Sequence, residues 1–427
     1  MAKCLVCLVS DQTIPNIILT ADLRPEYLLL ISTRGMEKKD KSRAILEALA
    51  LHGADYSSRH KVIEVSEDSI ADFRKKVGDW IESTDREWEY IVNLTCGTKL
   101  MSIAAYDFFK SNFGSEMLYV PIPKNEFVTP FPVRRQKAPA ILKERLSVVE
   151  YFTAYGFRVI NEHNLAKHRR QAEAREDTTS FIFDHYPDIF PLLRFFRDQI
   201  HPIEKKLKAE RGYPFSASFT ARNERQAVLL ERLGFEYRGT AVNRVICKAD
   251  WEYLRGGWLE EYLFTCIRDA APPGVYADIL LNVRCKDPQG VENEFDVVFA
   301  FENGLHLVEC KSLEAAEGDE QHIGGTINDF LYKLGALRRH FGLTPRAFLA
   351  TTSKDVLDKS GGLKKNLVER GRQFTTEIVA LETERDLKGY FRRLVFEGCA
   401  RPHAHENAGS MGFGSKAPKH EMTGLVQ

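Results

Sequence analysis

Residues 295–312 read FDVVFAFENGLHLVECKS, in which two apolar runs meet at Glu-Asn-Gly. An Asn-Gly pair between apolar runs is the strongest short-range signal for a two-residue β-hairpin, because both turn positions need positive φ. We therefore predict a hairpin with Asn303 and Gly304 as its turn.

The predicted register brings three charged side chains onto one face of the hairpin. It places Asp296 opposite Lys311, and it places Glu309 opposite Val298. Since side chains alternate between faces along a strand, Asp296 and Val298 share a face with both partners.

A cluster of two carboxylates and an ammonium is costly to bury unless the groups pair or hold a metal. The simpler alternative is a cross-strand salt bridge on an exposed sheet face. The apolar flanks of the hairpin favour a site. Carboxylate oxygens suit Mg²⁺ or Mn²⁺, which polarise phosphoryl oxygens.

Length, charge and cysteine usage set limits on the protein class. The chain has 427 residues, enough for two or three domains. Its 60 basic and 60 acidic residues balance, so a surface for nucleic acid must be local. Cys4 and Cys7 are three apart in one apolar run, which predicts opposite faces and buried, reduced thiols. We expect a cytoplasmic protein with no membrane partner.

The first part of the chain alternates apolar runs with amphipathic helical stretches. This pattern predicts a parallel or mostly parallel, Rossmann-like α/β sheet. The expected strands are CLVCLV, YLLLIS, KVIEV, EYIVNL and EMLYVPI, and the expected helices are SRAILEALALHG, IADFRKKVGDWIES and TKLMSIAAYDFFKSNFG. The proline-containing stretch over 121–140 is interpreted as a boundary.

The segment NLTCGTK, residues 93–99, follows a strand and opens a helix. Free amides and the helix dipole at such a point favour an anion, and Gly97 lets the backbone approach it closely. Thr95, Thr98 and Lys99 add donors. The alternative is a well-capped turn with no ligand, and from the residues alone the two interpretations are equally supported.

Two further turns are expected at the same carboxyl edge of the sheet. Ligands of open parallel sheets bind beyond the carboxyl ends of their strands. The loop after the first strand and the loop after the second strand contribute polar groups, namely Ser10, Gln12, Pro15 and Asn16, and then Ser32, Thr33 and Arg34. Three polar loops together suit a ligand with several phosphates and hydroxyls.

These segments resemble a known family. SDQTIPN and NLTCGTKLMSIAA are similar to the CARF domain, the cyclic oligoadenylate sensor of type III CRISPR defence. GGWLEEYL, NEFDVVF, LHLVECKS and LYKLGALRR resemble the nuclease half of CARF-containing PD-(D/E)xK effectors, the CRISPR ancillary nucleases. The motifs occur in the family's order. A second glycine that is familiar in the family's turn is replaced by Cys96 here.

The resemblance implies a role for each residue of the hairpin cluster. Asp296 and Glu309 would be metal ligands, Lys311 the catalytic lysine, and Cys310 the donor of a backbone carbonyl to the metal. Glu260, in GGWLEEYL, would be the additional acidic residue over the metal.

Three neighbouring residues are weaker candidates. Glu261 is the second choice to Glu260. Lys333 and Arg338, in LYKLGALRR, could contact the scissile backbone, although basic residues on a helix more often face solvent.

The domain organisation expected from these signals is a CARF sensor over 1–135, a small mixed connecting domain over 136–250 with a winged helix as one possible form, and a restriction-endonuclease-like α/β/α nuclease over 251–400. Residues 401–427 are expected to be a flexible tail.

The function implied by the resemblance is a metal-dependent endonuclease, using Mn²⁺ or Mg²⁺, that cleaves RNA or DNA. Cyclic oligoadenylate, most simply cyclic tetra-adenylate, would activate it, and a homodimer would match the two-fold ring. The alternative is a ligand-sensing transcriptional regulator with an inert nuclease fold.

Overall fold

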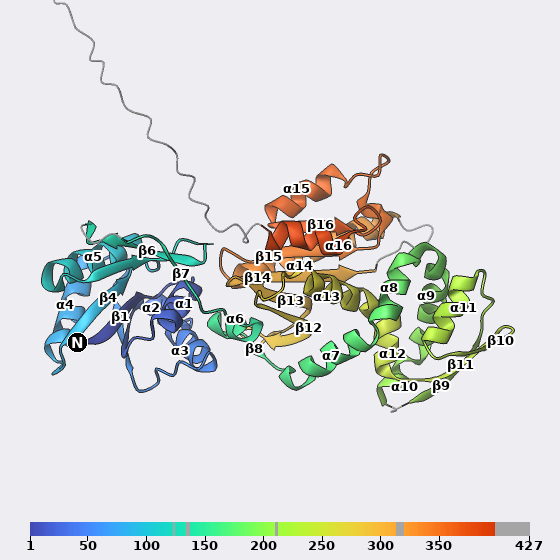
Figure 1. The fold of residues 1–427 in the computed structure, drawn as a ribbon, viewed down its shortest axis with the longest axis horizontal. Coiled ribbons are helices and arrows are strands. Elements are labelled where there is room, and N and C mark those ends of the chain that lie inside the picture. The colour runs from blue at the N-terminus through green and yellow to red at the C-terminus, as the bar shows by residue number, and fades with distance from the viewer. Residues whose placement is uncertain (123, 134–136, 210–211, 313–319, 398–427) are drawn as a thin grey trace, which may run out of the picture.

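The computed structural model describes residues 1–122, 124–133, 137–209, 212–312 and 320–397. Within these residues the chain forms sheets of seven, six and three strands, which lie in three parts of the molecule in Figure 1. After the expectations above, they are called the sensor half, the central nuclease half and the peripheral lobe. None of the described helices is long and apolar enough to span a membrane. The expected tail over 401–427 lies outside the described residues.

The first sheet has the order β3-β2-β1-β4-β5-β6-β7, and its first five strands are parallel, as predicted. Its strands are β1 (Ala2–Leu8), β2 (Tyr27–Thr33), β3 (His60–Val65), β4 (Trp88–Asn93), β5 (Glu116–Tyr119), β6 (Glu126–Phe131) and β7 (Ala140–Ile141). Its helices are α1 (Ile14–Leu23), α2 (Arg34–Glu37), α3 (Lys41–Leu51), α4 (Ile70–Glu82) and α5 (Lys99–Phe113).

Helices cover both faces of this sheet. Cys7 packs in the apolar cluster under α1 and α3, and Cys4 packs in the cluster under α4 and α5. The two thiols are therefore buried on opposite faces, which confirms the prediction from their offset of three.

Two features of the sensor half differ from the prediction. Pro15 and Asn16, expected in a loop, lie in the first turn of α1, because proline is well suited to the start of a helix. The stretch expected to be a boundary contains β6, which adds an antiparallel edge to the sheet. Alternating polar and apolar residues around Pro130 gave too weak a strand signal.

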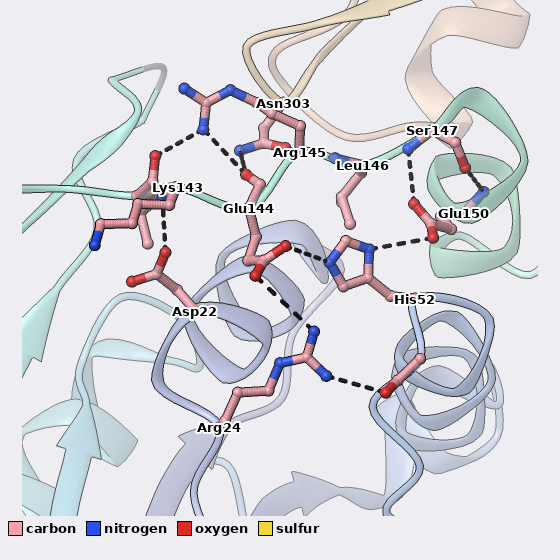
Figure 2. A network of polar contacts seen from close by, with 12 residues as sticks. Asp22, Arg24, His52, Lys143, Glu144, Arg145, Leu146, Ser147, Glu150 and Asn303 are labelled. Atoms are coloured by element: carbon pink, nitrogen blue, oxygen red, sulfur yellow. Dashed lines mark hydrogen bonds and ion pairs between the residues drawn. The ribbon is translucent and has the colours of Figure 1, made fainter. Parts of the chain in front are cut away.

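A short segment joins the sensor to the nuclease, and polar contacts fix it to both (Figure 2). His52, at the end of α3, lies between Glu144 and Glu150, with ring nitrogens 3.0 and 3.1 Å from their carboxylates. On the other side, the backbone amide of Leu146 donates to Asn303 at 2.9 Å. This segment is therefore held on both sides.

Helix α6 (Val148–Ala154) continues this connection through apolar packing. Its residues lie in one cluster that contains α1 and α3 of the sensor and also β13 and β14 of the nuclease. The sensor and nuclease halves thus share a hydrophobic core across α6. Such packing resists free swinging of one half against the other.

The peripheral lobe comprises a three-stranded antiparallel sheet, order β10-β11-β9, and several helices. Its elements are α7 (Glu162–Ala174), α8 (Glu176–Asp184), α9 (Tyr186–Ile200), α10 (Glu204–Ala209), β9 (Tyr213–Ser218), α11 (Glu224–Arg232), β10 (Glu236–Arg238), β11 (Ala241–Ile246) and α12 (Lys248–Glu252). The expected mixture of helix and strand is present, and the winged-helix assignment stays a prediction.

The nuclease half is a six-stranded mixed sheet in the order β16-β15-β14-β13-β12-β8. The bounds of its elements are β8 (Arg158–Val159), α13 (Trp258–Ala270), β12 (Ala277–Lys286), β13 (Glu292–Phe301), β14 (Gly304–Lys311), α14 (Glu320–His340), β15 (Arg346–Thr351), α15 (Lys365–Gln373), β16 (Thr376–Ala380) and α16 (Leu387–Phe391). Helices α13 and α16 pack on one face, and α6 and α14 pack on the other, as an α/β/α arrangement requires.

Candidate nuclease and sensor sites

The hairpin forms as predicted, but its turn lies one residue earlier. Glu302 and Asn303 take positive φ, 48° and 58°, whereas Gly304 is the first residue of β14. Val298 pairs with Leu307 and Ala300 with Leu305. The predicted pairing of Val298 with Glu309 was therefore wrong by two residues. A shift of two preserves which face each side chain occupies, so the predicted convergence of charges survives the error.

Tertiary contacts explain the position of the turn. The Asn303 side-chain amide donates to the Asn125 side chain at 2.7 Å. Glu302 forms an ion pair with Arg145 at 2.7 Å. Asn125 directly precedes β6 of the sensor half and Arg145 lies in the joining segment, so no local sequence rule could have included them.

The strand pair opens at the end where the charges lie. The β13–β14 ladder ends at the pair Val297 and Val308. Beyond it, the Cys310 amide donates to Oδ2 of Asp296 at 2.7 Å instead of to a strand carbonyl. A carboxylate thus replaces a ladder hydrogen bond, which fixes Asp296 beside β14.

Lys311 lies between the two carboxylates. Its Nζ is 2.8 Å from Oε1 of Glu309 and 3.5 Å from Oδ2 of Asp296. Nζ of Lys333, on α14, is 3.7 Å from the same Glu309 oxygen. Phe330, also on α14, places its ring 4.7 Å from the Lys311 ammonium. Phe330 could not be predicted from sequence, because an aromatic residue on a helix usually indicates only packing.

Burial sets the electrostatics of this cluster. Burial, reinforced by Glu309, raises the pKa of Asp296 to about 6. Burial alone would lower the pKa of Lys311, but Asp296 and Glu309 together hold it above its usual value. The ammonium therefore lies as a cation and hydrogen-bond donor between the two carboxylates.

Glu260 joins the cluster from α13. A Cβ on Gly256, just before this helix, would come within 3.0 Å of the Ser312 hydroxyl, so the helix begins close to the end of β14. Burial, reinforced by Asp296, raises the pKa of Glu260 to about 8. Glu261 instead pairs with Arg175, which supports the preference for Glu260.

The donor set fits a hard divalent cation. Asp296 and Glu260 have raised pKa values because their carboxylates are largely buried and close to other negative charge, and a bound cation would offset that charge. Burial also raises the pKa of the Cys310 thiol, which keeps it neutral and leaves the backbone as the donor at that position. No group of three histidine, cysteine or acidic side chains with metal-binding geometry occurs in the described part of the chain.

A cleft of about 1060 Å³ opens beside this cluster. Glu260, Cys310 and Lys311 line its inner end, and the lobe contributes Lys167 and Arg197 from α7 and α9. The cleft therefore lies between the nuclease sheet and the peripheral lobe. Arg338, by contrast, donates to the carbonyl of Pro345 at 3.0 Å and closes the end of α14, so it is engaged in structure rather than facing this cleft.

The turn over 93–99 has the geometry of a helix entry. Thr98 caps α5 by accepting from the Met101 amide at 3.2 Å. Gly97 has φ of 80°, and a Cβ there would lie 2.9 Å from Cβ of Leu8, so glycine is required. Thr98 and Lys99 are both exposed, but the Thr98 hydroxyl also donates to the Glu67 carbonyl at 3.0 Å, so Lys99 is the side chain left to meet a ligand.

Buried amides support this turn from below. Asn93 donates to Oδ1 of Asn16 at 2.9 Å, and Asn16 donates to the Leu8 carbonyl at 2.8 Å. Thr95 donates to Asn93 at 2.5 Å and accepts from the Val120 amide at 2.8 Å. Asn16 is fully buried. Its predicted place in an open ligand loop is therefore corrected to a structural position under the turn.

The remaining predicted sensor residues divide into two groups. Ser32 and Thr33 are buried at the end of β2, and Thr33 caps α2. Ser10 and Gln12 are half-buried in the loop after β1. Oε1 of Gln12 accepts from the Leu343 amide of the nuclease half at 3.3 Å, a contact that the sequence did not predict.

Comparison with known proteins agrees with this architecture. Residues 4–151 match the family model described as the Card1 CARF domain, and residues 247–380 match the Card1-like endonuclease domain. No curated protein is similar enough in sequence to match the chain.

Two solved structures share the fold across most of the chain. Protein VC1899 from Vibrio cholerae aligns with a TM-score of 0.70 and 18% identity, covering 92% of this chain and 97% of its own. Can2 from Sulfobacillus thermosulfidooxidans, solved with cyclic tetra-adenylate, aligns with a TM-score of 0.65 and 19% identity, covering 92% and 98%. The chain therefore joins a CARF domain of the Card1 type, over residues 4–151, to a Card1-like endonuclease domain, over residues 247–380.

Proposed function

We propose that this protein is a metal-dependent endonuclease that cyclic oligoadenylate activates in type III CRISPR defence. The observation that carries the proposal is the cluster of Asp296, Glu309 and Lys311 at the open end of the β13–β14 hairpin. An endonuclease domain that retains this set has the groups that phosphodiester hydrolysis needs.

In this proposal Asp296, Glu309 and the Cys310 carbonyl hold Mg²⁺ or Mn²⁺, with Glu260 packed over them. The bound metal would polarise the phosphoryl oxygens and lower the pKa of an attacking water. Hydrolysis forms a bond from water oxygen to phosphorus and breaks the bond to the leaving sugar oxygen.

Lys311 serves as a fixed donor in the same reaction. Its ammonium, 2.8 Å from Oε1 of Glu309, would be directed at negative charge that develops on the phosphoryl group. Lys333 supplies a second cation 3.7 Å from Glu309 and can engage a neighbouring phosphate. The cleft beside Lys311 offers room for the strand, with basic side chains contributed by the lobe.

The sensor half would bind the activator at the carboxyl edge of its sheet. Thr98 and Lys99 are exposed at the N-terminus of α5, where amides and the helix dipole favour phosphate. Cyclic tetra-adenylate is the simplest choice, since Can2 was solved with that ring. A homodimer would present two such turns to one two-fold ligand.

A ligand-sensing regulator with an inert nuclease fold is the second candidate. The compact cluster around Lys311 argues against it, because an inert domain gains nothing from confined carboxylates.

The test is cleavage of labelled single-stranded RNA, single-stranded DNA and nicked duplex, with and without cyclic tetra-adenylate and with Mn²⁺, Mg²⁺ or EDTA. We expect cleavage only when both activator and metal are present. Cleavage in EDTA would contradict the metal assignment, and no cleavage under any condition would favour the regulator.

A further inference from the structure

A second cleft, of about 960 Å³, lies between the sensor and nuclease halves, and we call it the interdomain cleft. The sensor lines it with the α2–α3 turn and the first residues of α3. The nuclease lines it with the end of α14 and the turn between β12 and β13. Thr98 and Lys99, of the turn predicted to bind the activator, do not line it, whereas Gln12 of the neighbouring loop does.

Its lining carries a surplus of positive charge. Eight lysines and arginines but only four acidic residues line the cleft. Two of the acids are already engaged, because Asp11 pairs with Lys39 at 3.0 Å and Glu47 pairs with Arg43 at 2.7 Å. Positive charge of this kind, focused between low-dielectric walls, attracts anions.

Lys41 is the most unusual member of this lining. Only 8% of the residue is exposed, and within the described residues it forms no ion pair with a carboxylate. Its ammonium lies 5.3 Å from the centre of the Tyr155 ring. Lysine is almost never so deeply buried without a partner, since removing an ammonium from water is costly. An anion in the cleft would supply the missing partner.

The backbone adds to this preference. Lys41 is the first residue of α3, an eleven-residue helix. Asp40, at the N-cap, has φ of 52° and its side chain makes no capping hydrogen bond. The first amides of α3 are thus not capped by the side chain that usually serves this purpose, and the positive end of the helix dipole lies beside the buried ammonium.

The opposite wall contributes cations that are also unpaired. Arg158 and Arg339 line the cleft, are exposed, and form no ion pair with any described residue. Arg158 belongs to β8 and Arg339 to the last turn of α14, so the nuclease half supplies both. Lys41 of the sensor half and Arg158 and Arg339 of the nuclease half therefore line the same cleft.

We propose that the interdomain cleft binds a phosphate-bearing ligand of nucleotide size, either a free nucleoside polyphosphate or one nucleotide of a strand. The cleft volume lies near the upper end of small-molecule sites, about 300–1,000 Å³, and far exceeds the space that a bare phosphate fills. Lys41 and the α3 amides would hold phosphate from the sensor side, and Arg339 would reach it from the nuclease side. Such a ligand would bridge the two halves.

The experiment measures binding of a fluorescent ATP analogue and of a fluorescein-labelled thymidine 12-mer to the full chain in EDTA. The test variants are Lys41→Met, which keeps an apolar stem, and Arg339→Ala, which is exposed and lies on the other half. Lys61→Met, an exposed lysine on β3 outside the cleft, is the matched control. Unlabelled pyrophosphate and saturating cyclic tetra-adenylate are added in parallel sets.

We expect each test variant to bind about tenfold more weakly, as loss of one charge-assisted contact implies, while Lys61→Met binds like the wild type. Displacement of the analogue by pyrophosphate identifies a free nucleotide site, and binding of the 12-mer alone identifies a strand site. If Lys41→Met does not fold, Arg339→Ala decides the question. Unchanged affinity in Arg339→Ala, or displacement of both probes by cyclic tetra-adenylate, would overturn the proposal.

Discussion

The nuclease cluster and the sensor turn differ in how their polar groups are satisfied. Around Lys311, charged groups are buried beside one another, and burial raises the pKa of Asp296 and Glu260 to about 6 and about 8. In the sensor turn, the buried Asn16 and Asn93 are neutral and fully engaged, and only Thr98 and Lys99 extend into solvent.

This difference implies that a ligand would stabilise the two regions in different ways. The nuclease cluster stores unfavourable electrostatic energy that a cation would release, which is typical of a catalytic site. The sensor turn is already satisfied, so a ligand adds contacts without repairing anything. Substitutions should therefore separate activity from stability at the first site and should affect the two regions in different ways.

The largest effect is expected for Glu309→Gln and Asp296→Asn. Each should reduce cleavage by at least about a thousandfold, because a catalytic charge is lost. Asp296→Asn should not lower the free energy of unfolding, since a carboxylate with a raised pKa is removed and asparagine can still accept from the Cys310 amide. Cleavage rates and denaturant unfolding check both parts.

The control is Glu292→Gln, since Glu292 is an exposed glutamate on β13, the strand that carries Asp296. This variant should cleave normally. Metal-dependent cleavage that survives in both site variants would remove the nuclease assignment. A marked loss of stability in Asp296→Asn would show that the cluster supports the fold instead of straining it.

The next largest effect concerns Lys99→Ala. Removing its ammonium should weaken activator binding about ten- to a hundredfold, the worth of a charge-assisted contact of roughly 1.5 to 3 kcal/mol. The nuclease cluster is untouched, so the cleavage rate should recover at high activator concentration. The measurement is an activator titration of cleavage, with Lys75→Ala, an exposed lysine on α4, as the control. Superimposable curves for Lys99→Ala and wild type would reduce the turn to a helix cap.

A smaller effect, on stability alone, is expected for Asn16→Ala. The change leaves the Leu8 carbonyl and the Asn93 amide buried without their partner, at a cost of about 1–3 kcal/mol for each unpaired group. Denaturant unfolding should show the loss. Asn112→Ala, at an exposed position on α5, should stay within about 0.5 kcal/mol of wild type. Equal stability of both variants would mean that the turn is not supported from below.

The smallest expected effect is a pH dependence at the junction. The hydrogen bond to Glu150 raises the pKa of His52, with a further contribution from Glu144. Because the folded pKa is above the unfolded value of about 6.5, the stabilisation is complete below that pH and disappears as pH rises through the folded pKa. The deficit of His52→Gln against wild type should therefore be largest below about pH 6.5 and should shrink as pH rises through the folded pKa. Partial solvent access limits the effect to about 1 kcal/mol or less. A deficit that does not change with pH would assign His52 a packing role only.

Sequence patterns predicted the sensor strands well because buried parallel strands appear as continuous apolar runs. They missed α1 (Ile14–Leu23), since Pro15 suggested a loop and the helix is buried on nearly all sides, so it has no clear polar face. They also missed β12, whose polar and charged residues weaken the strand pattern at the edge of the cleft. Both elements lack the clear periodicity on which a sequence-based prediction depends.

The site was predicted because strand periodicity is robust to a shift of two. Face assignments for Asp296, Glu309 and Lys311 needed only the parity of the register. The turn position needed Asn125 and Arg145, which are far away in sequence. Contacts such as Lys333 with Glu309, or Gln12 with Leu343, depend on how α14 packs and cannot be inferred from local spacing.

One feature of the peripheral lobe bears on how the protein folds. Its core does not end at the lobe, because Phe196 and Leu229 belong to the same apolar cluster as Phe264 and Phe299 of the nuclease half. Residues that share a core tend to gain and lose structure together. The lobe and the nuclease sheet should accordingly melt as one cooperative unit, and a truncated chain lacking the lobe would expose the apolar face of α13 and aggregate rather than fold as a smaller enzyme.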